Sequence, residues 1–419
     1  MQKQRLIIEG GHKLSGEITV QGAKNSSLPI LAGTILTDEE IILKNCPRLT
    51  DIFAGCRILN HMGGSCGIDG NVIRVKNDGI SRFEIPDEMM REMRSSIIFL
   101  GAILGRYGKC KLSFPGGCEL GPRPIDMHLS ALRKMGAVIK EEYGIIDCEA
   151  PKGLKGEKIQ LSFPSVGATE NIMLSAVLAK GDTEIRNSAR EPEIKDLANF
   201  LNACGADIRN AGESTIYIRG VEKLHGCEYE IMPDRIVTAT YISAVAGAGG
   251  ELKIAGADIS DLYSVASVFE QAGCYIYSYK NGIYVSAVKP LKAVPNIRTM
   301  PYPAFPTDAQ AIVMSALCKA EGISVFEENI FENRYRHVDS LIKMGGNIKV
   351  FGKVAIVEGV KKLYGAKVSA TDLRGGASLV VAGVMADGIT EIDNIGYIDR
   401  GYEEIERAFS SIGAKIKRV

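Results

Sequence analysis

A cysteine and an arginine stand five residues apart in a segment rich in glycine and proline. The segment, Phe114-Pro-Gly-Gly-Cys-Glu-Leu-Gly-Pro-Arg-Pro124, contains Cys118 and Arg123. Three glycines and three prolines in eleven residues exclude the interior of a helix or strand and predict a loop. A nearby cation favours the thiolate, which lets a cysteine act as an acid, a base or a nucleophile near neutral pH. An average cysteine simply fills space, but this setting favours a chemical role for Cys118.

Asp308 is the second candidate for chemistry, in the run Ala304-Phe-Pro-Thr-Asp-Ala-Gln310. Thr307 or Asp308 would serve as the N-cap of a following helix, and capping alone would explain an acid here. Among phosphate ligands, an aspartate could instead remove a proton from a hydroxyl group. Efficient removal would need the Asp308 pKa to be raised by burial or by a neighbouring phosphate.

Cations recur where helices are expected to begin. The starts of two sets of helices carry Lys24-Asn25, Arg94, Val166-Gly167, Asp234-Arg235, Thr307-Asp308 and Asp372-Leu-Arg374, and Arg48, Arg123, Arg190-Glu191, Asp258, Arg334 and Arg400. Helix N-termini already attract anions, so added cations indicate an anionic ligand, unless each arginine pairs with a nearby carboxylate. No phosphate-binding GxxxxGK[ST] loop occurs, and no GxGxxG follows a strand. These residues alone predict a site for a multiply phosphorylated small molecule and leave its reaction open.

The chain repeats one unit six times. A glycine that would end a helix recurs about every 70 residues, at Gly63, Gly136, Gly205, Gly273, Gly345 and Gly413. Each unit has the pattern helix, strand, helix, hairpin. The first helices are expected at 26–36, 95–104, 169–179, 237–246, 309–320 and 377–385, and the strands that follow them at 40–44, 110–113, 183–187, 251–254, 322–326 and 390–393. We therefore predict an α/β protein with two domains of three units each and a cleft between them.

Composition excludes several classes of function. Lys+Arg and Asp+Glu both number 50, so no net basic field would gather nucleic acid or an anionic membrane. Apolar stretches such as 95–105 are shorter than the ~18–20 residues of a membrane span, and the N-terminus lacks the apolar core of a signal peptide. Ten cysteines without CxxC pairs and five scattered histidines indicate reduced thiols, without a disulfide framework or a metal site. We expect a soluble cytoplasmic protein.

Ten motifs, in this order, closely resemble the UDP-N-acetylglucosamine 1-carboxyvinyltransferase family. They are GAKN at 22–25, RSS at 94–96, PGGCELGPRPID at 115–126, SVGAT at 165–169, AREPEI at 189–194, PDR at 233–235, PAFPTD at 303–308, FENRYRH at 331–337, TDLR at 371–374 and DRGY at 399–402. The resemblance implies two inverse α/β-barrel-like (prism) domains, each of three βαβαββ-type units, with the active site in the interdomain cleft. The implied domains are residues 23–231, and residues 1–22 plus 232–419.

The resemblance also implies an activity. The enolpyruvyl group of phosphoenolpyruvate would pass to the 3′-hydroxyl of UDP-N-acetylglucosamine, with release of phosphate, as the first committed step of peptidoglycan precursor synthesis. Both substrates are small molecules. No metal, organic cofactor, nucleic acid, membrane or obligate protein partner is implied.

Roles for individual residues follow from the same resemblance. Cys118 matches the general acid that protonates carbon 3 of phosphoenolpyruvate, and its thiolate could attack carbon 2; Asp308 matches the base for the sugar hydroxyl. The positions that match phosphoenolpyruvate binders are Lys24, Asn25, Arg123 and Arg400, of which Lys24 and Arg400 also count as catalytic. Those that match sugar-nucleotide contacts are Arg94, Arg123, Pro124, Ile125, Asp126, Met127, Ser165, Val166, Gly167, Asp308 and Ile330. Arg334, Asp372 and Arg374 match charged residues of the cleft. Phe163 stands where some members carry lysine, so no charge contact is expected there.

Three alternatives stay open. A 5-enolpyruvylshikimate-3-phosphate synthase would have serine-rich sequence after the early lysine and no cysteine in the 114–124 loop. A non-catalytic sugar-nucleotide-binding regulator would have lost Cys118, Asp308 or Arg400. A redundant second copy of the transferase cannot be told apart by sequence.

Overall fold

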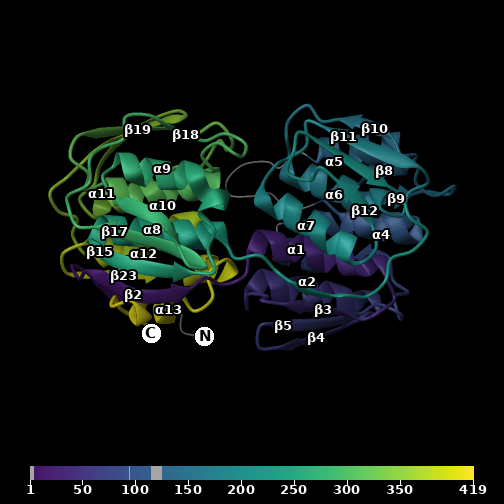
Figure 1. Cartoon of the computed structure of the whole chain (residues 1–419), viewed down its shortest axis with the longest axis horizontal. Helices are drawn as coiled ribbons and strands as arrows, with labels where there is room; N and C mark the ends of the chain where they lie inside the picture. The colour runs from purple at the N-terminus through teal and green to yellow at the C-terminus, as the bar shows by residue number, and fades with distance from the viewer. Residues whose placement is uncertain (1–3, 94, 115–124) are drawn as a thin grey trace. The chain divides into compact units, whose positions relative to one another are not determined.

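The computed structural model describes residues 4–93, 95–114 and 125–419, which form two compact units. Unit 1 comprises residues 4–21 and 233–419. Unit 2 comprises the described residues between 22 and 232. The chain therefore passes from one unit to the other after Gln21 and after Met232 (Figure 1).

Each unit contains three four-stranded sheets of one design, in which the first two strands are parallel and the remaining pairs are antiparallel. In unit 1 the orders are β22 (Lys367–Ser369), β23 (Ile389–Asp393), β1 (Leu6–Glu9), β24 (Lys415–Arg418); β2 (Leu14–Thr19), β15 (Gly250–Ala255), β17 (Gly282–Ala287), β16 (Tyr275–Tyr279); and β18 (Ile297–Arg298), β19 (Ile323–Glu327), β21 (Val354–Glu358), β20 (Asn347–Phe351). In unit 2 they are β14 (Glu228–Glu230), β3 (Ile41–Lys44), β5 (Val72–Lys76), β4 (Ser65–Asp69); β6 (Glu84–Ile85), β7 (Lys109–Ser113), β9 (Ile145–Glu149), β8 (Val138–Glu142); and β10 (Lys158–Gln160), β11 (Asp182–Arg186), β13 (Thr215–Arg219), β12 (Asp207–Arg209).

Three helices form the centre of each unit. They are α8 (Arg235–Ala248), α10 (Thr307–Leu317) and α12 (Leu373–Met385) in unit 1, and α1 (Lys24–Gly33), α4 (Phe99–Tyr107) and α6 (Val166–Ala176) in unit 2. In unit 1 the three pack against one another (Figure 1), and in unit 2 α4 contacts both α1 and α6. Their apolar and small residues on every side explain why they are buried along most of their length. The six helices expected from the sequence are confirmed.

The second helix of each of the six repeated units packs on the outside of the core. These helices are α2 (Thr50–Met62), α5 (Asp126–Lys134), α7 (Pro192–Ala203), α9 (Tyr263–Gln271), α11 (Val338–Lys343) and α13 (Ile405–Ser411). The remaining helical segments are α3 (Asp87–Glu92), η1 (Thr34–Leu36), η2 (Ser96–Ile98), η3 (Ile259–Leu262) and η4 (Ile395–Arg400). The six glycines expected to end these helices all have φ between +94° and +106°. Glycine adopts this left-handed conformation without strain. Its recurrence at all six positions, together with six sheets of one design, confirms the predicted repeat.

Two features of strand pairing go beyond the repeat. The sixth repeat of the sequence ends with a single strand, β24, where the other repeats end with a hairpin. Strand β1, from the start of the chain, takes the place of the missing hairpin strand and pairs with β24, with Leu6 opposite Arg418. Strands β2 and β14 are exchanged between the units. β2 precedes α1 but pairs with β15 of unit 1, whereas β14 precedes α8 but pairs with β3 of unit 2.

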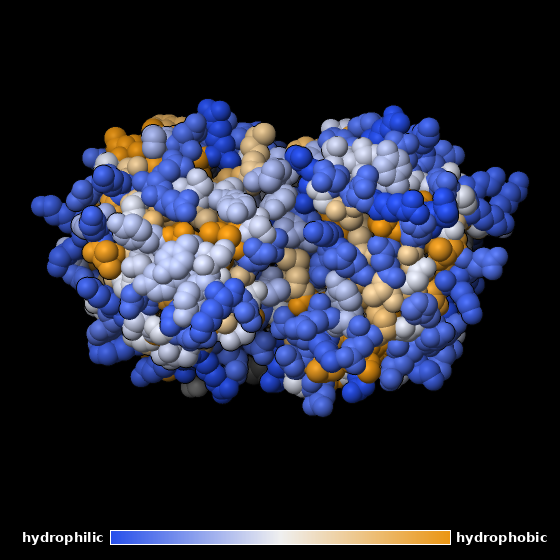
Figure 2. Space-filling view, viewed as in Figure 1, coloured by the Kyte–Doolittle hydropathy of each residue, from blue (hydrophilic) through white to orange (hydrophobic). Residues whose placement is uncertain are grey.

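No helix in the described ranges is both long and apolar enough to cross a membrane. On the face shown in Figure 2, hydrophobic side chains lie in small separate groups among hydrophilic ones. The nine cysteines outside 115–124 are free thiols, and the same part of the chain holds no cluster of three or more His, Cys, Asp or Glu side chains suited to a metal ion.

Candidate active site

The three core helices of unit 1 begin with charged residues, but only two of them begin with an acidic cap. Asp234 caps α8 by accepting hydrogen bonds from the N–H groups of Ile236 and Val237. Asp372 caps α12 through the N–H groups of Arg374 and Gly375. The residue before α10 is Pro306, which makes no side-chain cap. Asp308 lies one residue inside this helix, so capping does not explain it.

Asp308 is instead paired with two buried arginines. Its Oδ1 lies 3.1 Å from Nη2 of Arg334, and its Oδ2 lies 3.0 Å from Nη2 of Arg374. The arginine side chains are 2% and 5% exposed, whereas the Asp308 side chain is 30% exposed. The carboxylate is therefore the part of this cluster that another molecule can reach. The cations at helix starts were expected either to bind an anionic ligand or to pair with a nearby carboxylate. For Arg334 and Arg374 the structure supports the pairing with a carboxylate.

The charges around Asp308 determine its protonation state. Burial raises the pKa of Asp308, but the opposing attraction of Arg374 and Arg334 is stronger and holds that pKa well below its ordinary value. The requirement of a raised pKa, which the sequence had suggested for a base at this position, is therefore not met in this arrangement. Asp308 is an ionised hydrogen-bond acceptor at neutral pH.

Further contacts fix the two arginines. Arg334 donates to the backbone oxygen of Thr307 at 2.9 Å from Nη2 and at 3.2 Å from Nε, and its Nη1 lies 3.8 Å from Oδ1 of Asp372. Arg374 donates from Nη1 to the Tyr402 hydroxyl at 3.4 Å. Arginine holds its five donors in a planar fork, so these contacts also fix the orientation of each guanidinium group.

Two more predicted residues of unit 1 lie on neighbouring segments. The buried Glu328 carboxylate accepts hydrogen bonds from the N–H groups of Ile330 and Phe331 and from the Thr307 hydroxyl. It thereby ties the loop of Ile330, which is half-buried, to the start of α10. Arg400 is the last residue of η4, and its side chain is also half-buried.

In unit 2, Lys24 and Asn25 are the first two residues of α1. Nζ of Lys24 lies 2.9 Å from Oδ2 of Asp51, in the first turn of α2. The Lys24 side chain is 13% exposed and that of Asp51 only 2%. The lysine is thus held by a buried carboxylate, and only a small part of its side chain is exposed.

The other predicted residues of unit 2 lie at the starts of α5 and α6. Ile125 is buried just before α5, Asp126 is exposed, and Met127 is half-buried and accepts a hydrogen bond from Ser162 at 3.5 Å. Ser165 caps α6 through the N–H of Ala168 at 3.3 Å, and Val166 and Gly167 form the first two positions of that helix. Arg94, Cys118, Arg123 and Pro124 lie outside the described residues.

Several supporting residues were not predicted from the sequence. Nδ2 of Asn171 lies 2.8 Å from Nδ1 of His128 and also donates to the Ile97 carbonyl, so it joins α6, α5 and the segment before α4. A Cβ added to Gly167 would lie 3.1 Å from Cε1 of His128, closer than an ordinary contact, so Gly167 packs directly against the imidazole ring. A polar residue in the middle of an apolar helix, such as Asn171, was the available signal. Asp51, Glu328 and Tyr402 carried no such signal.

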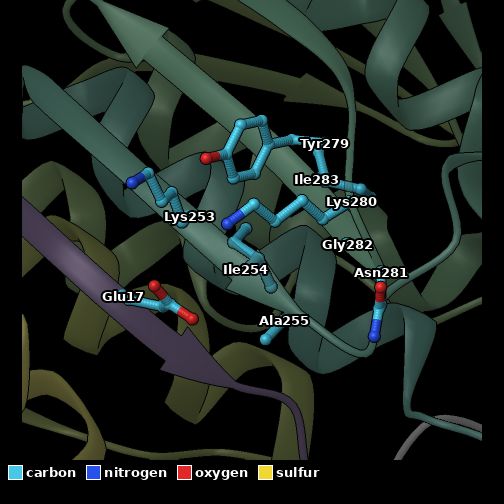
Figure 3. Close-up of a pocket in the computed structure, with 9 residues that line it drawn as sticks. All are labelled: Glu17, Lys253, Ile254, Ala255, Tyr279, Lys280, Asn281, Gly282 and Ile283. Carbon is cyan, nitrogen blue, oxygen red and sulfur yellow. The ribbon is translucent and has the colours of Figure 1, made fainter.

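A separate cavity of about 170 Å³ lies against β2, β15 and β17. In Figure 3 Glu17 projects from β2, while Lys253 and Lys280 lie beside Tyr279. The two ammonium groups lie 5.2 and 5.4 Å from the centre of that ring. None of the predicted site residues lines this cavity, so we do not assign the reaction to it.

The EPSP synthase (3-phosphoshikimate 1-carboxyvinyltransferase) family matches residues 8–409 of the chain. Among curated relatives, UDP-N-acetylglucosamine 1-carboxyvinyltransferase 2 of Caldanaerobacter subterraneus subsp. tengcongensis is 50% identical, covering 98% of this chain and 99% of its own. UDP-N-acetylglucosamine 1-carboxyvinyltransferase of Lawsonia intracellularis is 47% identical, covering 99% of each chain.

Solved structures support the same fold. The enolpyruvyl transferase NikO from Streptomyces tendae has a TM-score of 0.89 at 25% identity, covering 100% of this chain and 99% of its own. EPSP synthase from Acinetobacter baumannii has a TM-score of 0.76 at 19% identity over the whole of both chains, and so resembles this chain in fold alone. The predicted fold of repeated α/β units is confirmed. With matches that span almost its full length, the chain belongs to the EPSP synthase family of enolpyruvyl transferases, in the group of UDP-N-acetylglucosamine 1-carboxyvinyltransferases.

Proposed function

We propose that this protein transfers the enolpyruvyl group of phosphoenolpyruvate to the 3′-hydroxyl of UDP-N-acetylglucosamine and releases phosphate, at the start of peptidoglycan precursor synthesis. The observation that carries the proposal is the activity named for relatives that are 47–50% identical over almost the full chain. The reaction takes place in the cytoplasm and needs no metal, organic cofactor or partner protein.

Binding of phosphoenolpyruvate requires cations, because the molecule carries a phosphate and a carboxylate. Lys24 and Arg400 supply them, together with Arg123, and Asn25 adds a neutral hydrogen-bond donor. The pairing of Lys24 with Asp51 supports this role, since a buried carboxylate holds the ammonium group in one place before the ligand arrives. The phosphate then accepts a hydrogen bond from the same ammonium group.

The reaction needs a proton added to carbon 3 of phosphoenolpyruvate and later removed from it, and another proton taken from the sugar hydroxyl. Cys118 gives its thiol proton to carbon 3 of phosphoenolpyruvate, which leaves carbon 2 electrophilic. The 3′-oxygen of the sugar then bonds to carbon 2 while its proton passes to Asp308. The Cys118 thiolate then takes back a proton from carbon 3 as the bond from carbon 2 to the phosphate oxygen breaks, and the phosphate leaves with the proton that Asp308 received.

The low pKa of Asp308 limits its strength as a base in the free protein. Two effects offset this limit. An anionic substrate beside Arg374 and Arg334 reduces the positive field that lowers the pKa. In addition, the sugar hydroxyl becomes strongly acidic as its oxygen bonds to an electron-poor carbon, so that a weak carboxylate base is sufficient at that moment.

The sugar nucleotide is held by the starts of α5 and α6 and by the loop of Ile330. The N-terminus of α6, with Val166 and Gly167, offers N–H groups and a positive dipole end, both suited to a diphosphate. The close packing of Gly167 on His128 keeps this helix start next to α5.

Phosphate release in the presence of each acceptor tests the proposal. The purified protein, given phosphoenolpyruvate and UDP-N-acetylglucosamine, is expected to release phosphate continuously. It should release none when shikimate 3-phosphate replaces the sugar nucleotide. Release with shikimate 3-phosphate alone would reassign the protein to the other branch of the family, and release with neither acceptor would favour a binding protein.

A further inference from the structure

One buried carboxylate holds the first turn of α1 from the side. Asp196 lies on α7 and is 7% exposed. It accepts a hydrogen bond from the Ser26 hydroxyl and, at Oδ1, another from the Tyr229 hydroxyl at 2.6 Å. The N–H of Met232 donates to Oδ2 at 3.3 Å. Asp196 thus connects α1, β14 and the last residue of unit 2 before the chain passes to unit 1.

The start of α1 depends on such lateral contacts because it has no side-chain cap. The residue at the cap position is Ala23, whose N–H donates to the Met232 carbonyl at 2.7 Å. The next two residues, Lys24 and Asn25, are two of the proposed phosphoenolpyruvate binders, and Ser26 follows directly. The backbone that carries both binders is therefore fixed just before them, where Ala23 bonds to Met232, and just after them, where Ser26 bonds to Asp196.

Gln21 makes an equivalent connection in unit 1. Its Nε2 donates to the Gly401 carbonyl at 3.2 Å, and its Oε1 accepts from the Glu403 N–H at 2.9 Å. The Gln21 carbonyl accepts from the Asp234 N–H at 2.9 Å. The turn at 401–403 directly follows Arg400, so the Gln21 amide fixes the backbone beside another proposed binder.

We propose that Asp196 and Gln21 are positioning residues for phosphoenolpyruvate, Asp196 through the first turn of α1 and Gln21 through the turn after Arg400. The inference rests on the proposed function. Neither residue needs to touch the substrate, because displacement of a binding cation by about 1 Å is enough to slow a reaction by about 10²-fold. Both act where the chain crosses between the units, after Gln21 and after Met232.

The substitution Asp196→Asn tests the proposed positioning role of Asp196. The amide keeps the size of the side chain but faces donors with an NH₂ group, so at least one hydrogen bond is lost. We expect kcat/KM for phosphoenolpyruvate to fall by about tenfold or more, within the range expected for misplacement. The KM for UDP-N-acetylglucosamine should stay within about twofold, since its proposed contacts lie elsewhere.

Asn77→Ala is the matched control for loss of stability. Asn77 is 2% exposed, and its Nδ2 donates at 2.8 Å to the carbonyl of Thr34, just beyond the far end of α1. The control should lower the thermal unfolding midpoint as much as Asp196→Asn while leaving kcat/KM for phosphoenolpyruvate within about twofold. Equal loss of kcat/KM in both variants would mean that Asp196 is merely structural and would overturn its positioning role.

Two milder substitutions separate the contacts of Asp196 and keep the test valid if Asp196→Asn does not fold. Ser26→Ala removes the contact to α1, and Tyr229→Phe removes the contact to β14. Ser26→Ala should reproduce most of the loss in kcat/KM for phosphoenolpyruvate, and Tyr229→Phe should cause little. Equal losses from the two, or no loss from Ser26→Ala, would contradict the assignment.

The substitution Gln21→Ala tests the proposed positioning role of Gln21, and should lower kcat/KM for phosphoenolpyruvate by about tenfold. Gln21→Glu keeps the acceptor for Glu403 but loses the donor to Gly401, and should have an intermediate effect. Gln160→Ala, on the edge strand β10, is the control and should behave like the wild type. Wild-type kinetics for Gln21→Ala would overturn this role alone, whereas absence of phosphate release by the wild-type protein would overturn the proposed function and both positioning roles together.

Discussion

At the scale of single residues, Asp308 shows why the type of a residue does not determine its chemistry. Removal from water raises the pKa of an acid, yet here two arginines with almost no exposure reverse the direction of the pKa shift of the partly exposed Asp308. A carboxylate that stays ionised can accept a proton from a hydroxyl group whose acidity rises as its oxygen forms a new bond. The protonation state of Asp308 is thus set by Arg334 and Arg374.

Removal of the Asp308 carboxylate gives the first prediction. Asp308→Asn should lower the rate of phosphate release by about 10²–10⁴-fold, the usual range for loss of a general base. Asp339→Asn is the control, because Asp339 is an exposed acid in the first turn of α11. Steady-state turnover measures both, and near-normal turnover of Asp308→Asn would show that another group takes the proton.

The direction of the Asp308 pKa shift gives a prediction for stability against pH. Because the folded-state pKa is depressed, the ionised carboxylate stabilises the fold at pH values above the unfolded-state pKa of about 3.9. This contribution is lost as the pH falls from there toward the folded-state pKa. The difference in unfolding midpoint between the wild type and Asp308→Asn should therefore be constant from about pH 5 to 7 and narrow below about pH 4. A difference that stays constant down to pH 3 would contradict the shift.

At the scale of elements, the glycines that end the outer helices are required by backbone conformation. Gly273 has φ +101°, and a Cβ added there would meet nothing within 4 Å. Gly273→Ala should therefore cost about 1 kcal/mol through left-handed strain alone. Gly396→Ala is the control, since Gly396 also has open space and does not adopt the left-handed conformation. Urea denaturation should place the control within about 0.5 kcal/mol of the wild type. An equal cost for both variants would indicate that conformation is not the reason for Gly273.

At the scale of the whole molecule, β1 joins the two ends of the chain in one sheet between β23 and β24. Ile8 on this strand is fully buried and Ile7 is half-buried. Ile8→Ala should destabilise the protein by about 2–5 kcal/mol, the cost of a cavity in a core, and Ile7→Ala by clearly less. Chemical denaturation measures both, and equal effects would show that β1 does not contribute to the core as its pairing implies.

The sequence alone determined the features that depend on neighbouring residues. Left-handed glycines such as Gly205 and apolar runs such as the one in α8 are local, so the six units and their core helices could be predicted. Lys24 and Asp308 could be singled out because their types and their places at helix starts carry the signal, whereas Arg400, also expected at a helix start, lies at the end of η4. The motifs around them identified the family.

Only the tertiary structure decided which of these parts act on one another. The partners of β2 and β14 are set by packing, since a strand's preceding and following helices do not determine the sheet that it joins. The protonation state of Asp308 depends on Arg374, 66 residues away, and the support of Ser26 depends on Asp196, 170 residues away. Electrostatic and hydrogen-bond energies depend on distance in space, and the chain brings such residues together only by folding.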